Sequence, residues 1–171
     1  MTDTFPGLYR GTVSQNVDPM QIGRVQVAVP DVSGIGLSTW ARPCFPMGGP
    51  AQGFFSVPMI GAGVFVMYEQ GDPDYPVWMG TFLGSPADKP LLANTVPPAI
   101  SAVTMQTLAK NGIVITDAGG PMGVGGITIQ STSGATIAVN DVGITITNGK
   151  GAIISMVGNA VDINAGALTI I

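Results

Sequence analysis

Few side chains in this sequence of 171 residues could carry out chemistry. Histidine is absent, so neither a Ser-His-Asp or Cys-His nucleophile nor an imidazole metal ligand is available. The single cysteine, Cys44, excludes an internal disulfide and a cysteine-based zinc site, and we expect it to be a small buried residue. The sequence therefore predicts a protein that is not an enzyme and that uses no cofactor or metal.

The carboxylates are the remaining candidates for a reactive or metal-binding group. Glu69 and Asp72 could form a glycosidase acid pair, but such a pair spans a cleft of about 5–10 Å, and a compact Gly-Asp-Pro-Asp loop suggests none. Asp72 and Asp74 could hold a metal, although aspartates in such loops usually cap turns. Asp117, Asp141 and Asp162 are 24 and 21 residues apart and could bind ions along a repeat; solvated turn residues are the favoured interpretation.

One arginine and two tryptophans complete the set of candidate binding residues. Arg24 could bind a ligand, but a lone arginine on a barrel strand more often forms an internal ion pair or a subunit contact. Trp40 and Trp78 could stack bases or sugars, and packing is the favoured alternative. The chain has 6 basic and 10 acidic residues, which disfavours nucleic acid as a partner.

The composition indicates that much of the surface is buried against other chains. Apolar residues make up 46 % of the chain and charged residues only 9 %, whereas a typical soluble domain carries about 25 % charge. The apolar stretches are shorter than the roughly 18 residues of a membrane span. The first residues lack the basic and apolar regions of a signal peptide, so we expect synthesis in the cytoplasm without one.

The chain changes character near residue 85. Aromatic residues occur only between Phe5 and Phe82, and prolines crowd the stretch that follows. We therefore expect a first domain over 1–84, a Pro-rich linker over 85–100 and a second domain over 101–171. Five short strands are expected in the first domain, without a convincing helix, and they fit a small closed barrel. Their ranges are 8–14, 22–29, 53–57, 63–69 and 75–82.

The second domain is a repeat of short β-branched strands separated by Gly, Asn or Asp. The strands are expected at 112–117, 126–130, 135–140, 143–148, 152–156, 160–164 and 167–171. Each reads apolar, polar, apolar, so one chain cannot close a core. We expect three identical chains wound around one axis, each lending a strand to each of three faces. The expected trimer core is Ile127, Ile129, Ile137, Val139, Ile144, Ile146, Ile154, Met156, Val161 and Ile163.

The last expected strand differs from the others because no polar cap follows it. Solenoids normally need such a cap for solubility. We therefore expect Leu168, Thr169, Ile170 and Ile171 to form a docking platform for a separate tip protein, with simple termination as the alternative.

Motifs in the first half resemble the OB-fold domain of contractile-tail spike proteins, the baseplate assembly protein V and gp5/VgrG-like family. The second half resembles that family's triple-stranded β-helix. The larger members carry a lysozyme domain or a fused hub domain, and neither is expected here. The motifs are Leu8-Tyr-Arg-Gly-Thr-Val, Val17-Asp-Pro, Gly23-Arg-Val-Gln-Val, Trp40-Ala-Arg-Pro-Cys44, 58–63 and Gly71-Asp-Pro-Asp-Tyr-Pro-Val-Trp-Met-Gly80.

The resemblance implies an all-β homotrimer, with an N-terminal OB-fold barrel followed by an intertwined triple-stranded β-helix. It implies a structural spike in the baseplate of a phage tail, tailocin or related injection particle, which pierces the target envelope with transient membrane contact. The implied partners are a gp27-like baseplate hub protein, with Phe5, Leu8 and Tyr9 as candidate contacts, and a PAAR-type tip protein. The alternative is an OB-fold module that binds oligosaccharide or nucleic acid on a trimerising stalk.

Overall fold

The change in composition near residue 85 coincides with a structural division of the chain. The computed structural model describes residues 3–34 and 36–170. These residues form two units, Met1–Pro86 and Ala87–Ile171, so the division falls within the expected linker. Each unit has its own sheet and is described separately.

Unit 1 is a small barrel of five strands. The strands are β1 (Tyr9–Gln15), β2 (Gln26–Ala28), β3 (Arg42–Pro43), β6 (Gly63–Tyr68) and β7 (Pro76–Phe82). They are ordered β2-β1-β6-β7-β3, with β3 parallel to β7 and the other pairs antiparallel. Isolated bridges between Val25 and Ala41 and between Ala28 and Leu37 join the two ends of this order, which closes the barrel.

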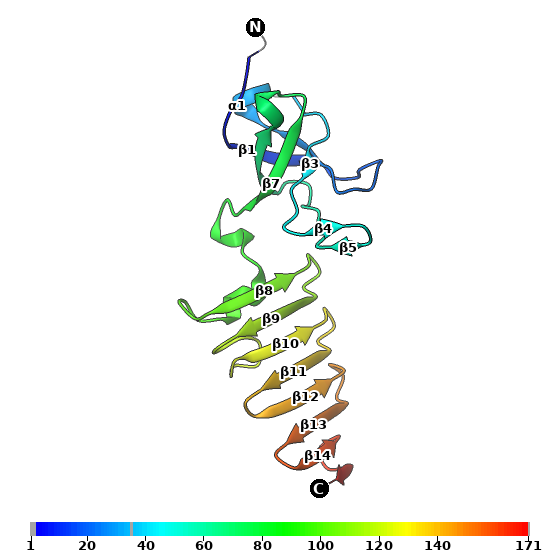
Figure 1. Cartoon of the computed structure of the whole chain (residues 1–171). Coiled ribbons are helices and arrows are strands. Elements are labelled where there is room, and N and C mark those ends of the chain that lie inside the picture. Colours follow the sequence, from blue (N-terminus) through cyan, green and yellow to red (C-terminus); the bar gives the residue numbers. More distant parts are fainter. Residues whose placement is uncertain (1–2, 35, 171) are drawn as a thin grey trace. The chain divides into compact units, whose positions relative to one another are not determined.

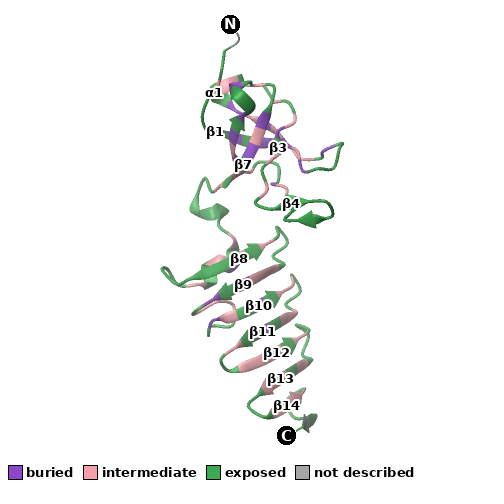
Figure 2. Ribbon diagram, in the orientation of Figure 1, coloured by how far each residue is buried: buried purple, intermediate pink, exposed green. Residues whose placement is uncertain are grey.

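Alternating valines explain the core of the barrel. Val25, Val27 and Val29 are fully buried, while the residues between them are only partly buried. Val64 and Val66 on β6 follow the same period of two, because successive side chains of a strand point to opposite faces. Buried residues (purple in Figure 2) gather in this barrel.

Short elements decorate the barrel between its strands. They are α1 (Pro30–Ser33), the hairpin β4 (Gly48–Gly49) and β5 (Gln52–Gly53), and the 3-10 turn η1 (Glu69–Gly71). The strand expected at 53–57 is wrong, because residues 54–57 pair with no other strand. The ring of Phe55 instead packs on that of Phe45, with centroids 5.5 Å apart, and remains largely exposed. The fifth strand of the barrel is instead β3. Its two residues, Arg42 and Pro43, show no alternation of apolar and polar residues from which a strand could be predicted.

Unit 2 is an eight-stranded antiparallel sheet in which each strand pairs with the strands before and after it (Figure 1). The strands are β8 (Ala102–Gln106), β9 (Gly112–Thr116), β10 (Gly126–Gln130), β11 (Thr136–Asn140), β12 (Gly143–Thr147), β13 (Ile153–Val157), β14 (Ala160–Ile163) and β15 (Leu168–Ile170). The expected distribution of one chain's strands over three faces is wrong for the described residues, because all eight strands lie in one sheet. Short connections such as residues 141–142 and 158–159 join antiparallel neighbours within one sheet.

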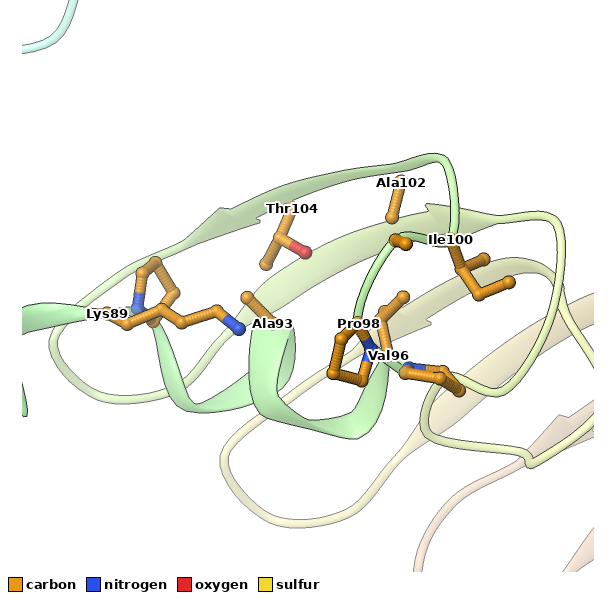
Figure 3. A pocket seen from close by; sticks show the side chains of 10 residues that line it. Lys89, Ala93, Val96, Pro98, Ile100, Ala102 and Thr104 are labelled. Atoms are coloured by element: carbon orange, nitrogen blue, oxygen red, sulfur yellow. The ribbon is translucent and has the colours of Figure 1, made fainter. Parts of the chain in front are cut away.

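Residues 87–100, here called the strap, cross one face of β8 and β9. The strap holds most of the 3-10 turn η2 (Pro86–Asp88) and all of η3 (Leu91–Thr95). The buried Leu92 donates its N–H to Gln106 Oε1 at 2.8 Å, and the carbonyl of Thr95 accepts the N–H of Gly120 at 3.0 Å. Figure 3 shows Ala93 and Pro98 of the strap beside Ala102 and Thr104 of β8, around a hollow of about 400 Å³.

Candidate functional site

The arginine singled out by the sequence forms an internal ion pair in unit 1. Arg24 Nη2 and Nε donate to Asp18 Oδ1 at 2.7 and 3.0 Å. The two carboxylate oxygens also accept the backbone N–H groups of Met20, Ile22 and Arg24. These hydrogen bonds, with the Arg24 guanidinium first, hold the pKa of the Asp18 carboxyl well below its usual range although burial opposes the shift. The expected internal ion pair is confirmed, and it shapes the loop before β2.

The other chemical candidates have structural roles or remain apart. Asp72 Oδ1 accepts the N–H of Asp74 at 3.0 Å, which is the turn-capping geometry. The buried Trp78 donates its indole N–H to the carbonyl of Gly23 at 3.1 Å, and Arg24 lies 5.5 Å over Trp40. Within residues 3–34 and 36–170, the structure shows no cluster of three or more Asp, Glu, Cys or His side chains placed for a metal.

Two residues lie elsewhere than expected. Cys44 is exposed, not buried as expected. It follows the end of β3, and its contact with the barrel is a hydrogen bond from its backbone N–H to the carbonyl of Trp78. Asp162 lies within β14 and accepts the N–H of Gly166, whereas Asp117 and Asp141 lie outside the strands as solvated residues.

The most extensive feature is the face of the unit 2 sheet that we call the apolar face. Strand register aligns its side chains in two unbroken columns from β8 to β15. One column is Val103, Ile115, Ile127, Val139, Ile144, Met156, Val161 and Ile170. The other is Met105, Ile113, Ile129, Ile137, Ile146, Ile154, Ile163 and Leu168. All ten expected core residues lie in these columns.

The apolar face is uncovered in a single chain. Eleven of its side chains are between 37 % and 58 % exposed. At about 25 cal/mol per Å² of apolar surface, removing the exposed part of one isoleucine from water contributes about 1–2 kcal/mol. A continuous apolar surface of this extent marks an interaction site.

The opposite face of the same sheet needs no partner. Apart from Val114, the central column of this face consists of small or polar residues, and the strap already covers its first two strands. Thr128 and Ala138 on this face are buried even in one chain. The column is Thr104, Val114, Thr128, Ala138, Thr145, Ser155 and Asp162.

The residues expected to meet other proteins lie at separate places. In unit 1, Phe5, Tyr9 and Tyr68 form a ring cluster with centroids 5.7–6.3 Å apart, and the side chain of Leu8 is exposed. In unit 2, Leu168 and Ile170 are exposed on the apolar face, and among residues 3–34 and 36–170 the strand paired with β15 is β14. Thr169 belongs to β15, while Ile171 lies outside the described residues.

A hollow of about 260 Å³ lies on the barrel between the β2–β3 segment and the β6–β7 loop. It is lined by Arg24, Thr39, Trp40, Arg42, Glu69, Asp74, Tyr75 and Pro76. Its lining combines two aromatic rings with both hydrogen-bond donors and acceptors. Thr39 also donates its hydroxyl to the carbonyl of Asp74 at 2.8 Å, which ties the loop to the barrel.

Comparison with known families accounts for most of the chain. Residues 9–83 match the type VI secretion system/phage-baseplate injector OB domain, and residues 102–169 match the phage baseplate V C-terminal trimerisation domain. No curated protein matches the chain. The expected all-β class and the order of a barrel followed by a trimerisation domain are confirmed. Among the described residues, no helix has the length and apolar character needed to cross a membrane.

Proposed function

Since the chain belongs to the phage baseplate V family, whose two domains are structural parts of a baseplate, we propose that three copies form the central spike of a contractile injection particle. The observation that carries the proposal is the apolar face. Its two columns continue through all eight strands and leave one chain with an exposed apolar surface, which the same surface of further copies would cover. Three such faces directed at one axis would share one core.

The proposed action is mechanical penetration of the target envelope. In each sheet the strands stack along one direction, so the ladder hydrogen bonds and the shared core resist an axial load together. The central column of the opposite face carries short side chains such as Thr128, Ala138 and Ser155. A rod covered by short side chains is narrow and offers few groups that hold it in a membrane.

We propose that one surface of unit 1 and one of unit 2 meet different proteins. The exposed Leu8, supported by the Phe5–Tyr9–Tyr68 cluster, is the proposed contact with a baseplate hub protein. The last strand is the proposed platform for a PAAR-type tip. Because Leu168 and Ile170 belong to the apolar face, β15 would present mainly its free backbone edge to that tip.

The mass of the full chain in solution is the direct test of the spike. We expect a particle of three chains of 17.4 kDa that resists SDS without boiling. A stable monomer would overturn the trimer and the spike together. Particles assembled with labelled chain should then carry the label at the centre of the baseplate, and a label elsewhere would reject the central position.

A second candidate function, oligosaccharide binding, is favoured by the hollow on the barrel. OB-folds bind oligosaccharides and oligonucleotides on the face of their second and third strands beside the loop that joins the fourth and fifth. The hollow lies at that place, and the aromatic rings of Trp40 and Tyr75 with nearby donors and acceptors suit sugar hydroxyls. Glu69 and Asp74 at the same hollow disfavour a polyanion.

Titration with soluble bacterial oligosaccharides, followed by NMR, tests this second candidate. We expect chemical-shift changes at Trp40 that disappear in Tyr75→Ala and remain in Tyr9→Phe, a change outside the hollow. Unchanged spectra at millimolar oligosaccharide would reject it and leave the spike unaffected.

A further inference from the structure

Unit 1 has an exposed apolar surface of its own, here called the methionine patch. Its side chains are between 41 % and 65 % exposed. They are Ile22, Met47, Phe54, Phe55, Met59 and Met79. With about 200 Å² for each large side chain, about half of it exposed, the methionine patch presents roughly 600 Å². That is the upper end of the largest patches on soluble monomers, about 300–600 Å², so the methionine patch marks an interaction site.

Contacts in the structure join these side chains into one surface. Phe54 and Met79 line a hollow of about 230 Å³. Pro58, the neighbour of Met59 in the sequence, lines the same hollow. Phe54 also donates its N–H to the carbonyl of Met47 at 3.0 Å.

The loop before β2 extends this surface, and most of it comes from an uncharged stretch of chain. A Cβ at Gly23 would lie 3.3 Å from Phe55 Cε2, so the loop that carries Ile22 lies against that ring. Between Pro43 and Tyr68 the sequence has no Asp, Glu, Lys or Arg, and this stretch supplies four of the six side chains. Methionine is unbranched and adapts its shape to a partner. The methionine patch therefore suits an apolar partner surface.

The methionine patch lies at the end of the barrel from which the chain leaves unit 1, here called the exit end. β7 ends at Phe82, which pairs with Gly63, the first residue of β6. Met79, Gly80 and Thr81, just before the end of β7, line the hollow. Figure 1 shows the β4–β5 hairpin at this end of the barrel.

The proposed hub contact lies at the opposite end of the same strands. Tyr68 is the last residue of β6, and its ring packs on that of Tyr9 with centroids 5.7 Å apart. A strand rises about 3.3 Å per residue, so about 17 Å separates the two ends of β6. A hub bound beside Tyr68 would leave the methionine patch for a different partner.

We propose that the methionine patches of the three copies meet one another in the trimer. The inference rests on the proposed trimer, and the occupant of each methionine patch is the same surface of the other copies. Ten residue steps join Phe82 to Leu92, which fixes the strap on unit 2, and they span at most about 35 Å. The trimer therefore keeps the three exit ends close together. A short tether gives a local concentration in the millimolar range, at which even a weak apolar contact is occupied.

Methionine oxidation followed by mass spectrometry tests the contact in the full chain. Dilute hydrogen peroxide should oxidise Met47 and Met59 at least threefold more slowly in the trimer than in Ile137→Asp, a variant expected to be monomeric. The matched control is Met67, which is 39 % exposed on β6 near Tyr68. It should react at the same rate in both proteins.

The outcomes separate this contact from the trimer itself. Met105, on the apolar face, reports the trimer because the shared core would shield it. Protection of Met105 without protection of Met47 and Met59 would overturn the contact between methionine patches and leave the spike standing. It would also leave the methionine patch to another protein. A wild-type chain that is monomeric by light scattering would contradict the proposed function as well.

A second measurement introduces charge at the same surface. Phe55→Asp with Met59→Asp would place six carboxylates where the three methionine patches meet, so the barrels should separate while unit 2 remains assembled. We expect the light-scattering mass of a trimer and a larger radius of gyration in small-angle X-ray scattering. Leu8→Asp with Met67→Asp, at two exposed side chains away from the exit end, should leave that radius unchanged. Equal radii for the two variants would contradict the contact.

Discussion

Leu92 of the strap lies directly against Gly112 of β9. A Cβ at position 112 would be 2.5 Å from Leu92 Cδ1 and 2.6 Å from the carbonyl oxygen of Met105, so only glycine fits there without movement. The contact fixes the strap on the face that carries Thr104 and Val114. The apolar face is therefore the one left for other copies of the chain.

Gly112→Ala should destabilise unit 2, because the added methyl group must displace Leu92 or the β8 backbone. Overpacking of this kind costs typically about 1–3 kcal/mol. Chemical denaturation followed by circular dichroism would measure the loss. Gly48→Ala is the matched control, since a Cβ at position 48 meets nothing within 4 Å. Equal stability of the two variants would show that the strap yields without cost.

The Asp18–Arg24 pair should make the stability of unit 1 depend on acid. Folding lowers the pKa of the Asp18 carboxyl. The contribution of the pair to the free energy of unfolding is therefore complete above the unfolded pKa of Asp18, about 4, and is lost as the pH falls below that value. Asp18→Asn should lower the melting temperature at pH 7 and flatten its dependence on pH between about 5 and 2. Asp31→Asn, at an exposed carboxylate, should retain the wild-type profile. A steep profile in Asp18→Asn would place the acid sensitivity elsewhere.

Much of unit 2 could be predicted from the sequence because each strand has its own local pattern of alternating residues. Alternating β-branched residues predicted 126–130 as observed, and the other ranges to within two residues. β8 was not predicted, since its sequence Ala-Val-Thr-Met-Gln contains few of the β-branched residues that mark the other strands. The sequence analysis interpreted the strap as a linker. Its packing depends on the contact of Leu92 with Gly112, 20 positions away, and such a contact produces no periodic pattern in the sequence.

The barrel was less predictable for a related reason. β3 is held by its parallel pairing with β7 and by the bridge between Val25 and Ala41, both long-range contacts. Phe54 and Phe55 give a stronger local strand signal than Arg42 and Pro43, yet they lie outside the ladder. The ion pair of Arg24 was anticipated, but its partner, Asp18, could be identified only from the structure.

A charge on the apolar face should prevent trimer formation. Ile137→Asp would bring three carboxylates into one apolar core, where an unpaired charge is strongly disfavoured. We expect a monomer of about 17.4 kDa by light scattering. Thr145→Asp, directly between Ile144 and Ile146 in the sequence but on the opposite face, should remain a trimer. A trimeric Ile137→Asp would mean that this face is not the interface.

Deletion of residues 167–171 should abolish tip binding while the trimer persists. Seven of the eight strands, β8 to β14, and their paired columns would remain, so most of the shared core is unchanged. The deletion removes β15, whose free backbone edge is the proposed contact with the tip. Light scattering would report the trimer, and co-purification with a PAAR-type domain would report tip binding. Lys150→Ala, in the β12–β13 turn, is the control that should keep both. Retention of the tip by the shortened trimer would refute the platform, and loss of the trimer would instead assign these residues to the core.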